Sequence, residues 1–68
     1  MAKPMGLYQR AIVAVALTAL EKGCKMPKIS EIARASGRNW QDTHRSYNAV
    51  LRRGKIILDG RKILEVRI

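Results

Sequence analysis

A chain of 68 residues forms one domain with a modest core, because a short chain buries a smaller share of its surface than a typical domain does. Hydrophobic residues make up 47% of the sequence, which excludes a compositionally disordered chain, and the absence of Phe leaves an aliphatic core. Fourteen Lys and Arg against five Asp and Glu give a formal net charge of +9, a field that attracts polyanions such as nucleic acids unless it serves only to keep the protein soluble.

The first predicted element is a helix over residues 7–22, preceded by a short aperiodic arm over residues 1–6. Gly23 is suited to end this helix. The apolar residues spread over much more than the ~100° stripe that one core needs, and they are Tyr8, Ile12, Val13, Val15, Leu17 and Leu20. We expect a homodimer along this helix, although cover by the hairpin and the other helices explains the wide apolar face equally well.

The apolar run within this helix, residues 11–20, is shorter than the ~20 residues needed to span a bilayer and lies between Arg10 and Glu21. No signal-peptide cleavage pattern accompanies it, so we expect a cytoplasmic protein with no membrane partner. The single Cys24 cannot form an internal disulfide, which fits a reducing compartment, and we expect it to be a buried structural thiol.

Two further helices are predicted after an extended link that contains Pro27. A short helix over residues 29–36 has an apolar inner face and stops at Gly37. A longer helix over residues 40–53 begins after Asn39, which is suited to cap its N-terminus.

An Asp-Gly turn between two β-rich runs predicts a hairpin over residues 55–68. A two-residue loop would pair Leu58 with Arg61, whereas a four-residue loop would pair Leu58 with Ile63 and Ile57 with Leu64. We favour the longer loop because it pairs apolar side chains across the strands. That register puts Arg61 and Lys62 at the tip of the hairpin.

The order short helix, glycine turn, longer helix and hairpin carries a characteristic set of residues: Ser30-Glu31-Ile32-Ala33-Arg34-Ala35-Ser36-Gly37, then Asn39, Thr43, Tyr47 and Val50, then Arg53-Gly54-Lys55-Ile56. This set resembles the winged helix-turn-helix family of small prokaryotic or viral transcription regulators, over about Met26 to Ile68 without a gap. Two positions depart from the family pattern: Arg38 follows the turn glycine where an apolar residue is usual, and Thr43 stands where Val or Ile is common. The resemblance implies an α+β fold, mainly α, with three helices and a C-terminal β-hairpin wing in a single domain over residues 1–68.

The third predicted helix separates two faces. Trp40, Thr43, Tyr47, Val50 and Leu51 fall on one side, and Gln41, His44, Arg45, Asn48 and Arg52 gather within ~100° on another that carries no carboxylate. In a major groove wide enough for a helix, Arg pairs with guanine and Gln or Asn pairs with adenine. We therefore predict base contacts by Gln41, His44, Arg45 and Asn48, above all by Gln41 and Arg45. Trp40 is expected to pack inside or at the helix N-terminus rather than on DNA, and His44 is explained equally well as a surface residue.

Contacts to the DNA backbone are predicted around this face. The family resemblance implies that the wing tip and the start of the second helix make them, here through Arg61, Lys62, Lys28 and Ser30. Charge and position add Arg38, Arg52, Arg53 and Lys55. Such contacts position a protein on DNA without reading its sequence.

No catalytic or metal-binding constellation is visible in the sequence. One Cys, one His and no paired carboxylates supply neither a metal site nor a nucleophile with its base, and the scattered glycines form no phosphate-binding loop. We therefore expect no enzyme, no cofactor, no metal and no small-molecule substrate.

Together these features predict a sequence-specific double-stranded-DNA-binding protein, a transcription regulator of phage or virus origin that is nucleoid-associated when bound. Two alternatives stay open: a non-specific architectural or recombination accessory (excisionase-like) protein, and a winged-helix module that docks to other proteins. RNA is a minor alternative, because no pair of exposed aromatic residues is apparent.

Overall fold

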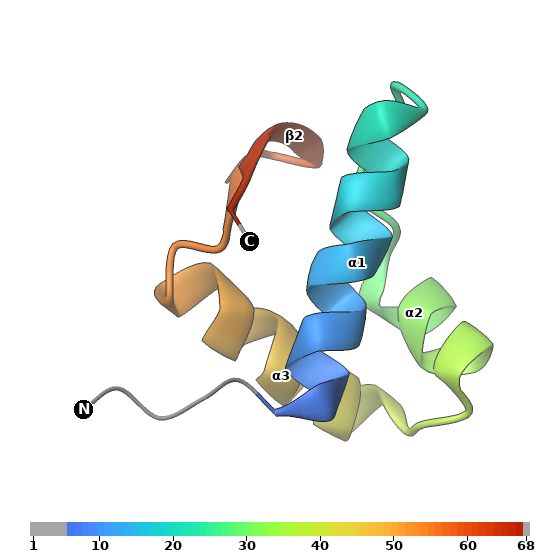
Figure 1. Cartoon of the computed structure of the whole chain (residues 1–68). Helices are drawn as coiled ribbons and strands as arrows, with labels where there is room; N and C mark the ends of the chain where they lie inside the picture. Colours follow the sequence, from blue (N-terminus) through green and yellow to red (C-terminus); the bar gives the residue numbers. More distant parts are fainter. Residues whose placement is uncertain (1–5, 68) are drawn as a thin grey trace.

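The computed structural model describes residues 6–67, which form three helices followed by a two-stranded antiparallel hairpin (Figure 1). The elements are α1 (Leu7–Glu21), α2 (Ile29–Ser36), α3 (Trp40–Arg52), β1 (Ile56–Asp59) and β2 (Lys62–Val66). This is the layout of a winged helix, and the expected α+β, mainly helical fold is confirmed. Helices α1 and α3 each end one residue earlier than predicted, because Lys22 and Arg53 are their C-caps and not their last helical residues. Of the predicted arm over residues 1–6, only Gly6 lies within the described residues.

Local capping fixes the turn that leads into α3. Gly37 follows α2 with a φ of 69°, in the left-handed region that favours glycine, and reverses the chain. The side chain of Asn39 then accepts a hydrogen bond from the backbone N–H of Asp42 at 2.8 Å, so the predicted N-cap is confirmed. The direction in which α3 leaves the turn is therefore set by residues close to it in the sequence.

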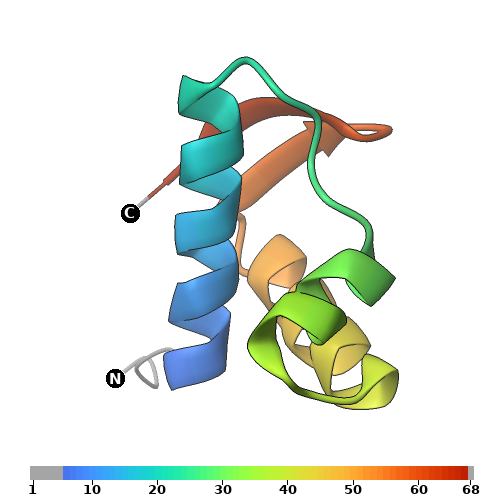
Figure 2. The ribbon, with the colours of Figure 1, turned by 90° about the vertical axis from the view of Figure 1, so that its right-hand side faces the viewer.

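The core is aliphatic, as the composition requires. α3 packs against both α1 and α2, and β2 packs against α1, whereas direct contact between α1 and α2 is sparse (Figures 1 and 2). Every helix, both strands and the link between α1 and α2 contribute buried apolar side chains, which are Ile12, Val13, Ala16, Ala19, Met26, Ile32, Ala33, Val50, Ile56 and Ile63. The core therefore holds α3 by one face and leaves its opposite face outside.

Both departures from the family pattern meet at Tyr8. The hydroxyl of the fully buried Thr43 donates to the Asn39 carbonyl oxygen at 2.9 Å and is also hydrogen-bonded to the Tyr8 hydroxyl. The Tyr8 hydroxyl lies 2.8 Å from Oγ of Ser36, and the Arg38 guanidinium carbon lies 4.4 Å from the centre of the Tyr8 ring. One aromatic side chain of α1 thus joins the end of α2, the turn and the first part of α3.

Removing the Tyr8 hydroxyl should destabilise the fold measurably. Tyr8→Phe is expected to lower the free energy of unfolding by about 1 kcal/mol, the net worth of a typical internal hydrogen bond. Urea denaturation followed by circular dichroism measures the loss. Tyr47→Phe is the matched control, because the Tyr47 hydroxyl has no hydrogen bond to another residue of 6–67. An equal loss in both variants would contradict a structural role for the Tyr8 hydroxyl.

The hairpin loop is shorter than predicted. Leu58 faces Ile63, as expected, but Asp59 also pairs with Lys62. The loop therefore holds two residues, a glycine with a φ of 63° and Arg61, and a positive φ at the first loop position is what a type II′ turn requires. Lys62 belongs to β2 and not to the tip.

The predicted pair of Ile57 with Leu64 is wrong. The register shifts between Ile57 and Leu58, so that Ile57 faces Glu65 and Leu64 is left 54% exposed. Strict alternation from the buried Ile63 would turn the Glu65 side chain toward the core. The bulge places Val66 against the core instead and leaves the carboxylate in solvent.

The turn of the hairpin is tied to the link between α1 and α2. The Arg61 guanidinium donates from Nε and Nη2 to the Met26 carbonyl oxygen at 3.2 and 3.1 Å. In return the Met26 backbone N–H donates to the Arg61 carbonyl oxygen at 2.8 Å, and the Met26 side chain is fully buried. The hairpin is thereby anchored at its tip as well as at its base.

The wide apolar face predicted for α1 is covered except at Leu20, which is 39% exposed. Leu7, outside that face, is 83% exposed. Cys24, expected to be a buried thiol, is exposed as well, because the turn after α1 carries it past the core and Met26 fills the buried position two residues later. Cover by the chain's own hairpin and helices therefore accounts for all of the predicted apolar face but Leu20.

Candidate nucleic-acid interface

The two predicted faces of α3 are present in the structure. On the inner side Thr43 and Val50 are fully buried, and burial raises the pKa of the half-buried Tyr47 hydroxyl, an effect that the charge of Arg61 opposes. On the outer side Gln41, Arg45 and Arg52 are exposed, while His44 and Asn48 are half-buried. All five outward side chains belong to residue types that bind bases or phosphates.

Of the two positions expected for Trp40, the interior is wrong, and the side chain packs at the N-terminus of α3. Its side chain is 51% exposed, and its ring stacks on the His44 ring with a centroid distance of 4.7 Å and an interplanar angle of 10°. Trp40 is the first residue of α3, and the buried row on this helix begins only at Thr43. The core therefore ends before it reaches Trp40, and the indole instead packs one turn along the helix surface.

A row of three side chains at four-residue spacing runs along the edge of the outward face. Trp40 stacks on His44, and Nδ2 of Asn48 lies 3.1 Å from Nε2 of His44. An amide NH2 group donates and does not accept, so this contact requires an unprotonated Nε2 on His44. The row holds the imidazole and the amide in fixed positions beside the exposed Gln41 and Arg45.

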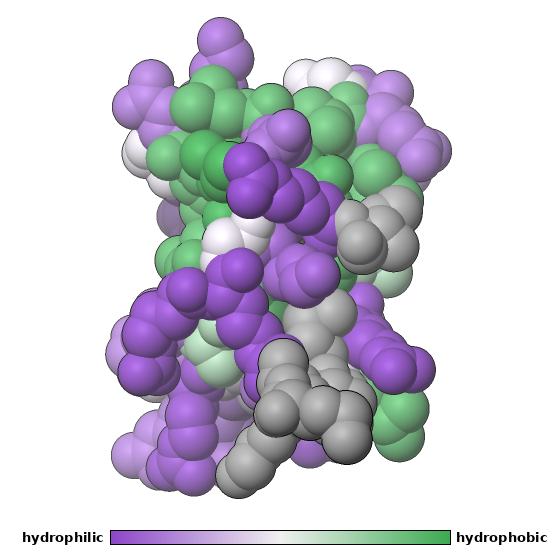
Figure 3. Space-filling view, turned by 60° about the vertical axis from the view of Figure 1, so that its left-hand side comes forward, coloured by the Kyte–Doolittle hydropathy of each residue, from purple (hydrophilic) through white to green (hydrophobic). Residues whose placement is uncertain are grey.

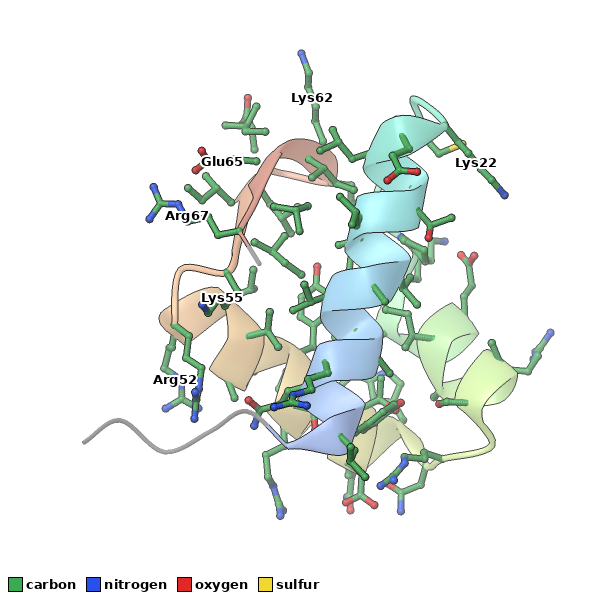
Figure 4. All side chains as sticks on the ribbon, viewed as in Figure 1. Lys22, Arg52, Lys55, Lys62, Glu65 and Arg67 are labelled. Atoms are coloured by element: carbon green, nitrogen blue, oxygen red, sulfur yellow. The ribbon has the colours of Figure 1, made fainter. Side chains whose placement is uncertain are left out.

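A second cationic cluster lies at the base of the hairpin. Figure 4 shows Arg52 and Lys55 at the same end of α3, where the chain leaves the helix. The backbone N–H of Arg67 donates to the Lys55 carbonyl oxygen at 2.6 Å, which brings a further guanidinium to this end. Arg67 pairs with Glu65 at 2.8 Å, but both side chains are more than half exposed, so the pair constrains Arg67 weakly.

The predicted backbone-contacting residues fall into three groups. Arg52, Arg53 and Lys55 lie at the C-terminal end of α3 or just beyond it, while Lys28 and Ser30 lie at the start of α2 and Arg38 in the turn before α3. Arg61 and Lys62 lie at the other end of the hairpin, where Arg61 binds Met26 and Lys62 points away from α3 (Figure 4). The structure thus brings the hairpin base, and not its tip, beside the outward face. Arg67 was missed because its position depends on the hairpin register.

No family model, curated protein or solved structure matches this chain. Within residues 6–67 no helix is long and apolar enough to cross a bilayer.

Hydrophilic side chains gather at the level of α3. Figure 3 shows them over the lower left of this view, whereas hydrophobic side chains gather mainly in the upper half, with hydrophilic ones at its edges and centre. α3 carries one acidic residue, Asp42, which lies in the first turn at the border of the outward face, one turn before Arg45. The outward face of α3 is therefore polar along its length, with cations on it and one carboxylate at its border.

Proposed function

We propose that this chain is a sequence-specific double-stranded-DNA-binding protein, a transcription regulator, that inserts α3 into the major groove. The observation that carries the proposal is the outward face of α3, where Gln41 and Arg45 are exposed beside the His44–Asn48 pair and no carboxylate interrupts them. The major groove of B-DNA is about 12 Å wide and admits one helix. Arg45 is suited to the two acceptors of guanine, and Gln41 to adenine.

In this proposal the cationic cluster at the hairpin base binds phosphates. Arg52, Lys55 and Arg67 flank the end of α3, so a duplex that receives α3 in its major groove brings a phosphate backbone toward them. Three to five such contacts would give a slope of log affinity against log salt of roughly −3 to −5.

The free thiol of Cys24 fits a reducing compartment, and we propose that the protein is cytoplasmic.

Selection from random duplexes tests the proposal directly. We expect one enriched motif, together with an affinity that falls steeply between about 50 and 200 mM salt. Duplex binding with no enriched motif, or with a merely bendable one, would favour a non-specific architectural or recombination accessory protein. No duplex binding at about 50 mM salt would favour a module that docks to other proteins.

Trp40 should report contact with DNA. It is the only Trp in the chain and is half exposed, so its emission spectrum is expected to change when a duplex covers α3. Trp40→Ala should weaken duplex binding roughly three- to tenfold, because an aromatic ring at the groove edge loses apolar contact with sugars and thymine methyl groups. Fluorescence anisotropy of a labelled duplex measures the loss. Leu64→Ala removes a similarly exposed apolar side chain from the hairpin and should leave affinity unchanged; matching losses would place Trp40 outside the interface.

A further inference from the structure

An apolar groove runs between α1 and the segment formed by the link and α2. It consists of two adjoining hollows of about 360 and 410 Å³ that share Val15 and Pro27. Ala11, Tyr8 and Ala35 line the first hollow, and Ala14 and Thr18 line the second. Figure 2 faces this side of the molecule, with α1 upright, α2 beside its lower half and the link above. No residue of α3 lines the groove.

The groove continues onto the exposed face of α1. Leu7, Ala11, Ala14 and Thr18 share this face at helical spacing, and all four are exposed. They form an exposed strip on the side of the helix opposite the buried Ile12 and Ala16, with Arg10 and Glu21 beside it. Ala14 is the middle residue of α1.

The two ends of the groove carry opposite charges. Glu31 lines the hollow beside the N-terminal half of α1, whereas Lys22 and Lys25 line the hollow beside its C-terminal half. None of these three side chains forms a salt bridge within residues 6–67. A two-fold axis near Ala14 sets two copies of α1 antiparallel, so Glu31 of each copy faces Lys22 and Lys25 of the other.

We propose that the groove is the self-association surface of this chain, covered by a second copy with α1 antiparallel to α1. An acidic peptide would match the lysine end and be repelled by Glu31, whereas a second copy matches both ends at once. Because α3 does not line the groove, both reading faces stay free in the dimer. This inference concerns a different surface from the DNA interface, and neither proposal depends on the other.

Sedimentation equilibrium on the free protein tests the dimer. The wild-type chain should be dimeric at about 100 µM and Ala14→Glu monomeric, with at least about a tenfold rise in the dimer dissociation constant, because two like charges would meet at the axis. Ala14 is exposed and helical, so the variant should keep its helical circular dichroism. The matched control is Leu64→Glu, which places the same charge on the other exposed apolar surface, at the hairpin, and should remain dimeric. A monomeric wild-type protein, or a dimeric Ala14→Glu variant, would overturn the proposal.

A crosslink fixes the orientation independently. In a Cys24→Ser background, Ala14→Cys should be joined into a covalent dimer by a short bismaleimide, while Leu64→Cys in the same background should not. Glu31→Lys should weaken the dimer a few-fold, and adding Lys25→Glu should restore it. Crosslinking at Leu64→Cys alone would move the interface to the hairpin. Absence of rescue in the double variant would contradict the antiparallel arrangement.

Discussion

Arg45→Ala is expected to weaken binding to the selected duplex by about ten- to a hundredfold while changing affinity for random duplexes only a few-fold. The Arg45 side chain is exposed near the middle of α3, where a helix in the major groove approaches the base edges most closely. A bidentate contact from Arg to guanine is worth about 1–3 kcal/mol of discrimination. Anisotropy titrations of both duplexes at one salt concentration measure the two losses.

Arg52→Ala is the matched control for this prediction. It removes the same side chain two turns further along the same face, at the end of the helix where the phosphates are expected. Its affinities for selected and random duplexes should fall by similar factors, and the salt slope should become shallower by about 1. If Arg45→Ala also lowers both affinities by the same factor, Arg45 binds phosphate and base reading must be assigned to other residues of α3.

Arg61→Ala is expected to lower the free energy of unfolding by about 1.5 kcal/mol, because the guanidinium donates two hydrogen bonds to the Met26 carbonyl oxygen. For a domain of this size, that loss corresponds to a fall in Tm of roughly 6–12 °C. Thermal unfolding followed by circular dichroism measures it.

Lys62→Ala tests the neighbouring position, where the side chain points into solvent from the same hairpin (Figure 4). Its free energy of unfolding should stay within about 0.5 kcal/mol of the wild-type value. The affinity of the Arg61→Ala variant for DNA, measured at a temperature where this variant is fully folded, should equal that of the wild type. A weaker affinity with an unchanged Tm would show that Arg61 acts on the DNA backbone, as the family resemblance implies.

The elements of the fold were predictable because their boundaries depend on neighbouring residues. The left-handed turn at Gly37 and the cap at Asn39 are local, and they fix where α2 ends and α3 begins. The outward face of α3 follows from helical spacing alone once Thr43 and Val50 are recognised as inner residues.

Other features depend on residues distant in the sequence. The contact of Arg61 with Met26 joins positions 35 residues apart, and no local pattern indicates that a wing arginine turns back to the link. The bulge beside Leu58 keeps Glu65 in solvent, a requirement that appears only once the hairpin has a core to face. Arg67 joins the interface through that register, so the sequence did not reveal it.

The position of Trp40 shows the limit of a helical wheel. A wheel assumes that the core extends along the whole helix, and it therefore assigns every apolar residue on the inner stripe to the interior. Here the buried row begins at Thr43, and the first turn projects beyond it. The misassigned side chain is consequently available on the face that we propose for DNA.

The anchored hairpin also has a thermodynamic consequence. The hydrogen bonds between Arg61 and Met26 hold the hairpin tip in the free protein. The wing therefore does not have to become ordered when the protein binds a duplex, and its ordering adds no entropy loss to binding. The heat-capacity change of complex formation would then reflect the surface buried against the duplex, without the larger contribution of a segment that folds on binding. In the proposed complex the anchored wing leaves adjustment of shape to the DNA, so stiff and flexible duplexes with the same contacted bases should differ in affinity.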